Sequence, residues 1–263
     1  MTQELIKEHQ KFEEEINQGE HGTNSLARYQ LAERVFRDLQ DSIWTKKIYE
    51  KCLLEVKEEN ADEEKYYYNN LAGIANSIYN SFDQDWAEEI FNEIFNSKNV
   101  GGMCGVAANL VWGDKADDES KKRAKQIFLD SVQPKFIESL PQDEKMNHLT
   151  NVISNLSVEL NDHEAAKLVI SIAESHVKTS DDMLTIGYCF SYTDQNTMRK
   201  YFNKAKEIAE TGEQLFNIGM KYNDELEDIK TAKTICKEAL TKFTSDEEED
   251  KKYYENMFKE VYG

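Results

Sequence analysis

Apolar residues recur along most of the chain at the i, i+3 and i+4 spacing that forms one face of an α-helix. Six such segments are separated by polar breaks. Their apolar cores are Leu31–Phe36, Leu71–Tyr79, Ala107–Trp112, Val152–Leu156, Ile186–Phe190 and Ile218–Tyr222. The pattern predicts a helix over each of them.

A second pattern follows each segment: in most copies a small residue, with two apolar residues three and four positions later. The copies start at Thr45, Ala87, Ala124 and Ala166, with weaker ones at Met198 and Ala232. These starts lie 42, 37, 42, 32 and 34 residues apart. Such a period predicts a repeat of antiparallel helix pairs, because one pair cannot bury its apolar face alone.

Local signals mark where these helices begin and end. Thr179–Asp182 supplies capping residues, and Thr211–Gln214 and Thr244–Glu247 have the Thr-x-x-Gln/Glu spacing of a capping box. Pro134 and Pro141 bracket the junction after the third pair. We therefore expect helix boundaries at all of these positions.

The two ends of the chain carry acidic segments with a narrower apolar stripe, at residues 2–18 and 246–262. Terminal helices of a repeat array need one polar outer face. The predicted organisation is an N-terminal acidic helix over 1–22, helical repeats over 23–243 as one domain, and a C-terminal capping helix over 244–263.

Over about residues 25 to 243 the chain resembles the tetratricopeptide-repeat family. The resemblance rests on Gly187-x-x-Phe190 followed by Phe202 and Ala205, and on Gly219-x-x-Tyr222 followed by Ala232, Cys236 and Ala239. Several units exceed the family's repeat of about 34 residues, and its closing proline is missing. Sel1-like and half-a-TPR repeats remain open. The resemblance implies an all-α, right-handed α-solenoid of about six antiparallel helix pairs with N- and C-terminal capping helices.

Composition narrows the range of functions. The chain has 51 acidic and 32 basic residues, a formal net charge of −19, and only 2 Pro and 11 Gly in 263 residues. The scarcity of Pro and Gly disfavours β architectures, which need them at tight turns. The negative charge disfavours binding to a nucleic-acid backbone. No apolar run reaches the ~18 residues that span a bilayer, and the first residues lack the apolar core of a signal peptide. We expect no membrane segment.

The four cysteines, Cys52, Cys104, Cys189 and Cys236, are widely spaced among apolar residues. This usage favours a reducing compartment, the cytoplasm, and free thiols that act as small apolar residues. No Cys or His cluster with the spacing of a zinc site is present.

No motif with catalytic spacing stands out. Glu144 with His148 and Glu159 with His163 lack the spacing of di-iron helices, and the second pair crosses an expected helix break. We expect the residues of both pairs to be solvated polar residues. The glycine-rich segment 101–105 does not end in Gly-Lys-Ser/Thr, as a phosphate-binding loop would. We therefore expect a loop that leads into a helix rather than a phosphate site. No catalytic, cofactor-binding or metal-binding residue is predicted.

The resemblance also implies a binding face. In the related repeats the concave face is lined by the first helix of each pair, at positions three before, one after and four after the small packing residue. The candidate partner-binding residues are Tyr29, Phe36, Arg37, Asn69, Asn76, Asn109, Trp112 and Tyr188. Asn side chains both donate and accept hydrogen bonds, as an extended peptide backbone requires. The alternative for Phe36 and Trp112 is that they fill the core.

Acidic runs at Glu55–Glu64, Asp114–Glu119 and Asp246–Asp250 are expected to be solvated and to surround this face. The leading hypothesis is a non-catalytic scaffold or adaptor that binds another protein through its groove, with a basic or neutral partner segment favoured. One alternative is an acidic inhibitor that occupies a nucleic-acid-binding surface of a target. The other is an all-α enzyme without a recognisable motif.

Overall fold

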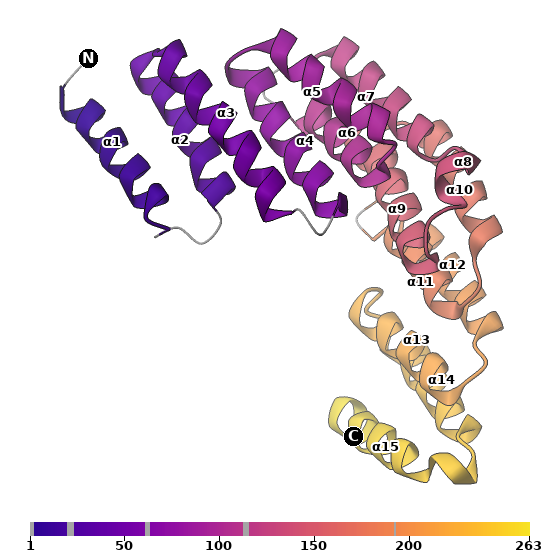
Figure 1. The fold of residues 1–263 in the computed structure, drawn as a ribbon. Helices are drawn as coiled ribbons and strands as arrows, with labels where there is room; N and C mark the ends of the chain where they lie inside the picture. Colours follow the sequence, from indigo (N-terminus) through magenta and orange to yellow (C-terminus); the bar gives the residue numbers. More distant parts are fainter. Residues whose placement is uncertain (1–2, 20–23, 61–63, 113–115, 192) are drawn as a thin grey trace. The chain divides into compact units, whose positions relative to one another are not determined.

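The computed structural model describes residues 3–19, 24–60, 64–112, 116–191 and 193–263 (Figure 1). Over these ranges the chain forms fifteen α-helices, one π-helical turn, one 3₁₀ turn and no strand, which confirms the all-α prediction. None of the helices in the described ranges combines the length and the apolar character needed to cross a bilayer. The chain divides into two compact units, Met1–Ile137 and Glu138–Gly263, and the division falls inside the range predicted as one repeat domain.

Unit 1 is built from successive helices that lie side by side (Figure 1). They are α1 (Gln3–Asn17), α2 (Asn24–Leu39), α3 (Ser42–Glu59), α4 (Glu64–Ser81), α5 (Gln84–Ser97), α6 (Val100–Trp112), α7 (Asp118–Ser131) and the short α8 (Pro134–Ile137). Helix α2 pairs with α3, α4 with α5, and α6 with α7. The first helices of these pairs also touch, because α4 contacts both α2 and α6.

The repeated sequence pattern accounts for the pairing in unit 1. Its small residues Thr45, Ala87 and Ala124 are completely buried, so they allow the two helices of each pair to approach. Each second helix starts with an Asp N-cap: the side chains of Asp41, Asp83 and Asp117 accept hydrogen bonds from backbone N–H groups three residues later. Such caps satisfy N–H groups that have no partner within the helix.

The glycines at 101–105 lie within helix α6, so the prediction of a loop there was wrong. A Cβ atom on Gly102 would lie 2.8 Å from the Tyr68 Cβ, and one on Gly105 would lie 3.0 Å from the Ala72 Cβ. Both glycines therefore serve the close approach of α6 to α4. The adjoining residues 113–115, which include the start of the acidic run at Asp114, lie outside the described residues.

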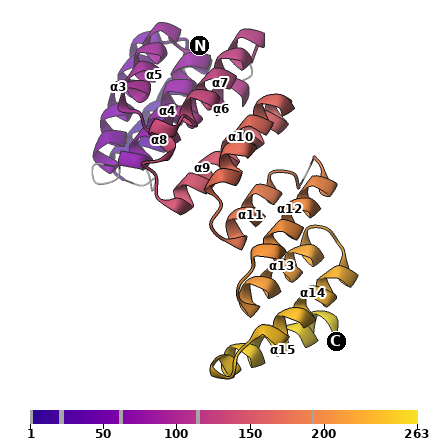
Figure 2. The same cartoon turned by 90° about the vertical axis from the view of Figure 1, so that its right-hand side faces the viewer.

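Unit 2 repeats the helix-pair arrangement (Figure 2). Its elements are α9 (Gln142–Ser154), η1 (Asn155–Glu159), α10 (His163–His176), α11 (Ser180–Tyr188), α12 (Gln195–Ile208), α13 (Gly212–Asp224), α14 (Ile229–Lys242), η2 (Ser245–Glu247) and α15 (Glu248–Tyr262). Helix α9 pairs with α10, α11 with α12, and α13 with α14. The capping boxes predicted at Thr211 and Thr244 are present, and Thr179 forms a third with Asp182.

The terminal helices bury little side-chain surface. Helix α1 buries Ile16 and His9, whereas α15 has no buried residue. Tyr254 of α15 packs its ring against Phe216 and Phe243, which attaches this helix to the pair before it. Both segments predicted as terminal helices are helical.

The four cysteines are predicted to resist thiol reagents while the protein is folded. Burial raises the pKa of Cys52 and Cys104 to about 12 and that of Cys189 and Cys236 to about 11. Because the thiolate is the reactive form, little of it is present at pH 8. Ellman's reagent should therefore modify no cysteine rapidly in the native protein and all four in denaturant. Rapid modification of even one native cysteine would contradict this assignment.

Candidate functional site

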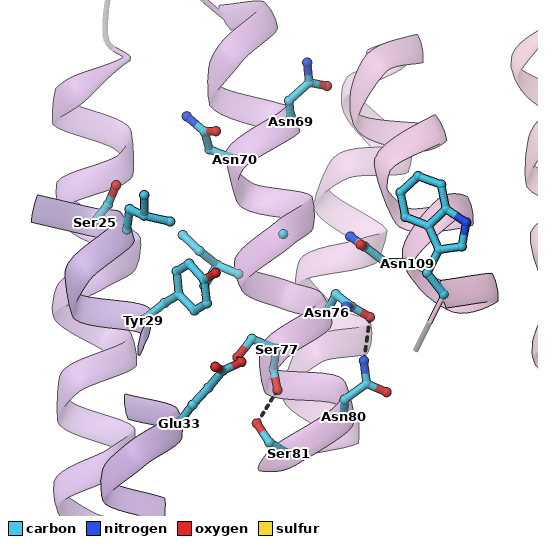
Figure 3. Close-up of a pocket in the computed structure, with 14 residues that line it drawn as sticks. Ser25, Tyr29, Glu33, Asn69, Asn70, Asn76, Ser77, Asn80, Ser81 and Asn109 are labelled. Carbon is cyan, nitrogen blue, oxygen red and sulfur yellow. Dashed lines mark hydrogen bonds between the residues drawn. The ribbon is translucent and has the colours of Figure 1, made fainter. Parts of the chain in front are cut away.

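Helices α2, α4 and α6 of unit 1 enclose a groove of about 840 Å³ (Figure 3). We call it the asparagine groove. Its lining residues are Ser25, Leu26, Tyr29 and Glu33 of α2; Asn69, Asn70, Gly73, Ile74, Asn76, Ser77, Asn80 and Ser81 of α4; and Asn109 and Trp112 of α6. Five of these fourteen residues are asparagines, an unusual concentration of amide groups in one concavity.

The groove is almost uncharged in a strongly charged protein. Residues 66–82, which include most of α4, and residues 99–113, which include α6, contain no Asp, Glu, Lys or Arg. Charged residues are 32% of the whole chain, so two adjacent helices with almost no charged residues differ clearly from its average composition. Of the described lining residues, only Glu33 carries a charge. The groove therefore offers hydrogen bonds and apolar surface rather than a strong field.

The asparagines of α4 follow the helical repeat. Asn69, Gly73, Asn76 and Asn80 are spaced i, i+4, i+7 and i+11, which places them along one face of the helix. Within this row, the Asn80 amide donates a hydrogen bond of 2.8 Å to Asn76 Oδ1. Gly73 leaves a gap in the row, since no atom lies within 4 Å of where its Cβ would be. A ligand can therefore approach the α4 backbone between two amide side chains.

Helix α6 adds an amide and an aromatic ring to the groove. Gly105 lets α6 approach α4, and one turn later Asn109 Nδ2 donates a hydrogen bond of 3.3 Å to the Ala72 carbonyl oxygen. This bond orients the Asn109 side chain and does not use its Oδ1 acceptor. Trp112, at the last turn of α6, is 61% exposed. An exposed Trp beside polar groups offers a large apolar contact together with an N–H donor.

A chain of hydrogen bonds holds the one carboxylate among the described residues of the groove. Ser77 Oγ donates to Glu33 Oε1 at 2.5 Å and lies 2.7 Å from the Tyr49 hydroxyl. Burial raises the pKa of Tyr49 to about 12, so this hydroxyl keeps its proton. Because the Ser77 hydrogen is directed to Glu33, Tyr49 acts as the donor to Ser77. The Glu33 carboxylate is thereby fixed in one orientation.

The dimensions suit a short extended chain. Asn69 and Asn80 are eleven residues apart on α4, which corresponds to about 16 Å at ~1.5 Å per residue. An extended peptide advances ~3.3 Å per residue, so about five residues fit along the groove. Amide side chains can form hydrogen bonds with the backbone N–H and C=O groups of such a peptide, whatever its side chains are.

The structure brings five of the eight predicted partner-binding residues into this groove: Tyr29, Asn69, Asn76, Asn109 and Trp112. The other three lie elsewhere. Phe36 is half-buried against Phe82, with ring centroids 5.4 Å apart, and Arg37 is exposed and hydrogen-bonded to Asp38. Tyr188 belongs to unit 2, where it contacts the Phe202 ring and lies beneath the Lys221 ammonium group.

Sequence reasoning missed several lining residues, notably Glu33, Ser77 and Asn80. Signals for two of them existed. Ala32 is the small packing residue of α2, and the position one after such a residue, here Glu33, is among those expected to face the groove. Asn80 extends the Asn69–Asn76 row by one helical turn. Ser77 gave no such signal, because its role depends on Tyr49 from the neighbouring helix α3.

The expectation that His148 is solvated was wrong, because it is 8% exposed. His9 is also buried, with 4% of its surface exposed. His9 packs edge-on against the Trp44 ring, and its Nε2 lies 3.3 Å from Asp38 Oδ2. Among the described residues, no three His, Cys, Asp or Glu side chains come together as a metal site would require.

Comparisons with protein-family models, with curated proteins and with solved structures gave no match for the chain.

Proposed function

We propose that this protein is a non-catalytic scaffold that binds an extended segment of another protein in the asparagine groove. The observation that carries the proposal is the row Asn69, Asn76 and Asn80, faced by Tyr29 and Asn109, in a groove of peptide dimensions. Buried polar groups without partners are costly, whereas amides at an open groove can pair with a ligand backbone. The row therefore supports recognition of main-chain groups.

We further propose that the helix pairs belong to a right-handed α-solenoid of the tetratricopeptide-repeat kind, with about six pairs. Support comes from the small residues at the contacts between helices, Ala87 and Ala124 in unit 1 and Gly187 and Gly219 in unit 2. In such arrays the first helices of successive pairs form a continuous surface, as α2, α4 and α6 do around the groove.

Filling the groove tests the proposal. Gly73→Leu places a side chain where no atom lies within 4 Å, and Leu is a better helix former than Gly. We expect the variant to fold normally and to lose at least about tenfold in peptide affinity, because the added side chain occupies the ligand's position. The measurement is binding of the full chain to an array of random synthetic nonapeptides, followed by fluorescence anisotropy on the strongest binders.

Asn92→Leu is the matched control, since Asn92 is an exposed residue of α5 outside the groove lining. It should bind the same peptides as wild type. Circular dichroism melting of all three proteins excludes misfolding as the cause. Equal binding by wild type and Gly73→Leu, or the absence of any peptide binder of wild type, would refute the proposal.

A further inference from the structure

The two ends of the asparagine groove differ chemically. At one end the labelled lining residues Ser25, Asn69 and Asn70 are all neutral. The other end carries Glu33 together with Ser77, Asn80 and Ser81 (Figure 3). A ligand that used only main-chain hydrogen bonds would gain nothing from a carboxylate at one end. The asymmetry therefore points to recognition of a side chain at that end.

The Glu33 carboxylate is held by the protein but is not neutralised by it. Its hydrogen-bond donor is the neutral hydroxyl of Ser77, which is supported by Tyr49. In the described part of the chain no ion pair includes Glu33. Two cations of the same helix are near Glu33. Arg34 lies over the Phe12 ring, and Arg37 feels the charge of Glu33 but makes its hydrogen bond to Asp38.

We propose that Glu33 selects a lysine or arginine at one fixed position of the bound segment. This inference rests on the proposed function and adds a sequence preference to it. The ligand is an extended segment whose backbone lies along the row of asparagines and whose basic side chain reaches Glu33. A charge-assisted hydrogen bond of this kind is stronger than a neutral one and has geometric specificity.

Charge elsewhere on the protein favours the same ligand. Unit 1 has 26 acidic and 17 basic residues, so its net charge is −9. A field of this sign increases the encounter rate of basic segments and opposes acidic ones. Because the groove itself is otherwise uncharged, one basic residue satisfies Glu33, and a polybasic segment gains little more within the groove.

A positional-scanning library of nonapeptides tests the inference on the full chain. Each pool fixes one residue type at one position, and the rest of the peptide is random. We expect wild type to enrich Lys and Arg at one position by about tenfold or more over Gln and norleucine, given the usual strength of hydrogen bonds to charged groups. The Glu33→Gln variant should lose this preference while still binding peptides.

Glu89→Gln is the matched control, because Glu89 is an exposed residue of α5 and its substitution changes the net charge equally. It should keep the Lys/Arg preference of wild type. Peptide binding by wild type without a basic preference, or with one that survives Glu33→Gln, overturns the inference and leaves the proposed function standing. No peptide binding by wild type at all overturns both.

Discussion

Replacing Arg28 with alanine is expected to lower the free energy of unfolding of unit 1 by about 3–5 kcal/mol, the usual cost of breaking a buried ion pair from one side. The Arg28 side chain is 1% exposed, and its Nε and Nη2 donate to the two carboxylate oxygens of Glu55 at 2.5 and 2.7 Å. Nη2 also donates to Asn17 Oδ1 at 3.2 Å. The substitution leaves the Glu55 carboxylate without its cation and opens a cavity beside α1, α2 and α3.

The measurement is urea denaturation followed by tryptophan fluorescence. All three tryptophans, Trp44, Trp86 and Trp112, belong to unit 1, so this signal reports the unit that contains Arg28. Arg37→Ala is the control, because its side chain is 71% exposed and its pair with Asp38 is solvated. That variant should unfold at the wild-type urea concentration.

A double substitution distinguishes the cost of leaving the Glu55 charge unpaired from the cost of lost packing. Arg28→Met with Glu55→Leu removes both charges and restores apolar contacts, so it should recover most of the stability that Arg28→Ala loses. If Arg28→Ala unfolds like wild type, the Arg28–Glu55 pair does not hold α2 and α3 together. If the double variant is no better than the single one, packing rather than the unpaired carboxylate accounts for the loss.

The Arg28–Glu55 pair also shows where sequence reasoning fails. Glu55 opens an acidic run that, read as sequence, predicts solvated carboxylates. In the structure Glu55 pairs with Arg28, and Glu59 accepts hydrogen bonds from the Ser25 backbone N–H and hydroxyl. Local sequence cannot reveal such pairs, because both partners look like ordinary surface residues until the helix pair brings them together.

Helices were predictable because their signals are local: apolar spacing, an Asp or Thr cap, and a small residue at the contact. The same holds for much of the groove, since Asn69 and Asn76 share a face of one helix by spacing alone. Glu33, Ser77 and Tyr49 come from three helices, and only the packing of α2, α3 and α4 links them. For Phe36 the sequence left two alternatives, the groove and the core, and its contact with the Phe82 ring favours the core.

In unit 2, substitution of Phe202 and Gly187 is expected to give strongly non-additive losses of stability. Phe202 is completely buried, with its ring edge-on to Tyr188 and Tyr222 at centroid distances of 5.6 and 5.7 Å. Phe202→Ala should lower the free energy of unfolding by about 3–5 kcal/mol. Gly187→Ala should lower it by about 1–3 kcal/mol, because the new Cβ would lie 2.9 Å from Phe202 Cε1.

The double variant tests whether the Phe202 ring is what excludes a side chain larger than glycine at position 187. Once Phe202 is alanine, the added methyl at position 187 enters the space that the ring vacates, so Gly187→Ala should become neutral or slightly stabilising in that background. Urea denaturation followed by far-ultraviolet circular dichroism gives the free energies, and hydrogen exchange of α11 and α12 localises the change to this pair. Gly73→Ala is the control, because its Cβ meets open space and the substitution should stabilise by about 0.5–1 kcal/mol. Additive losses would instead mean that the Tyr201 Cβ, 3.2 Å from the same position, forces glycine at 187.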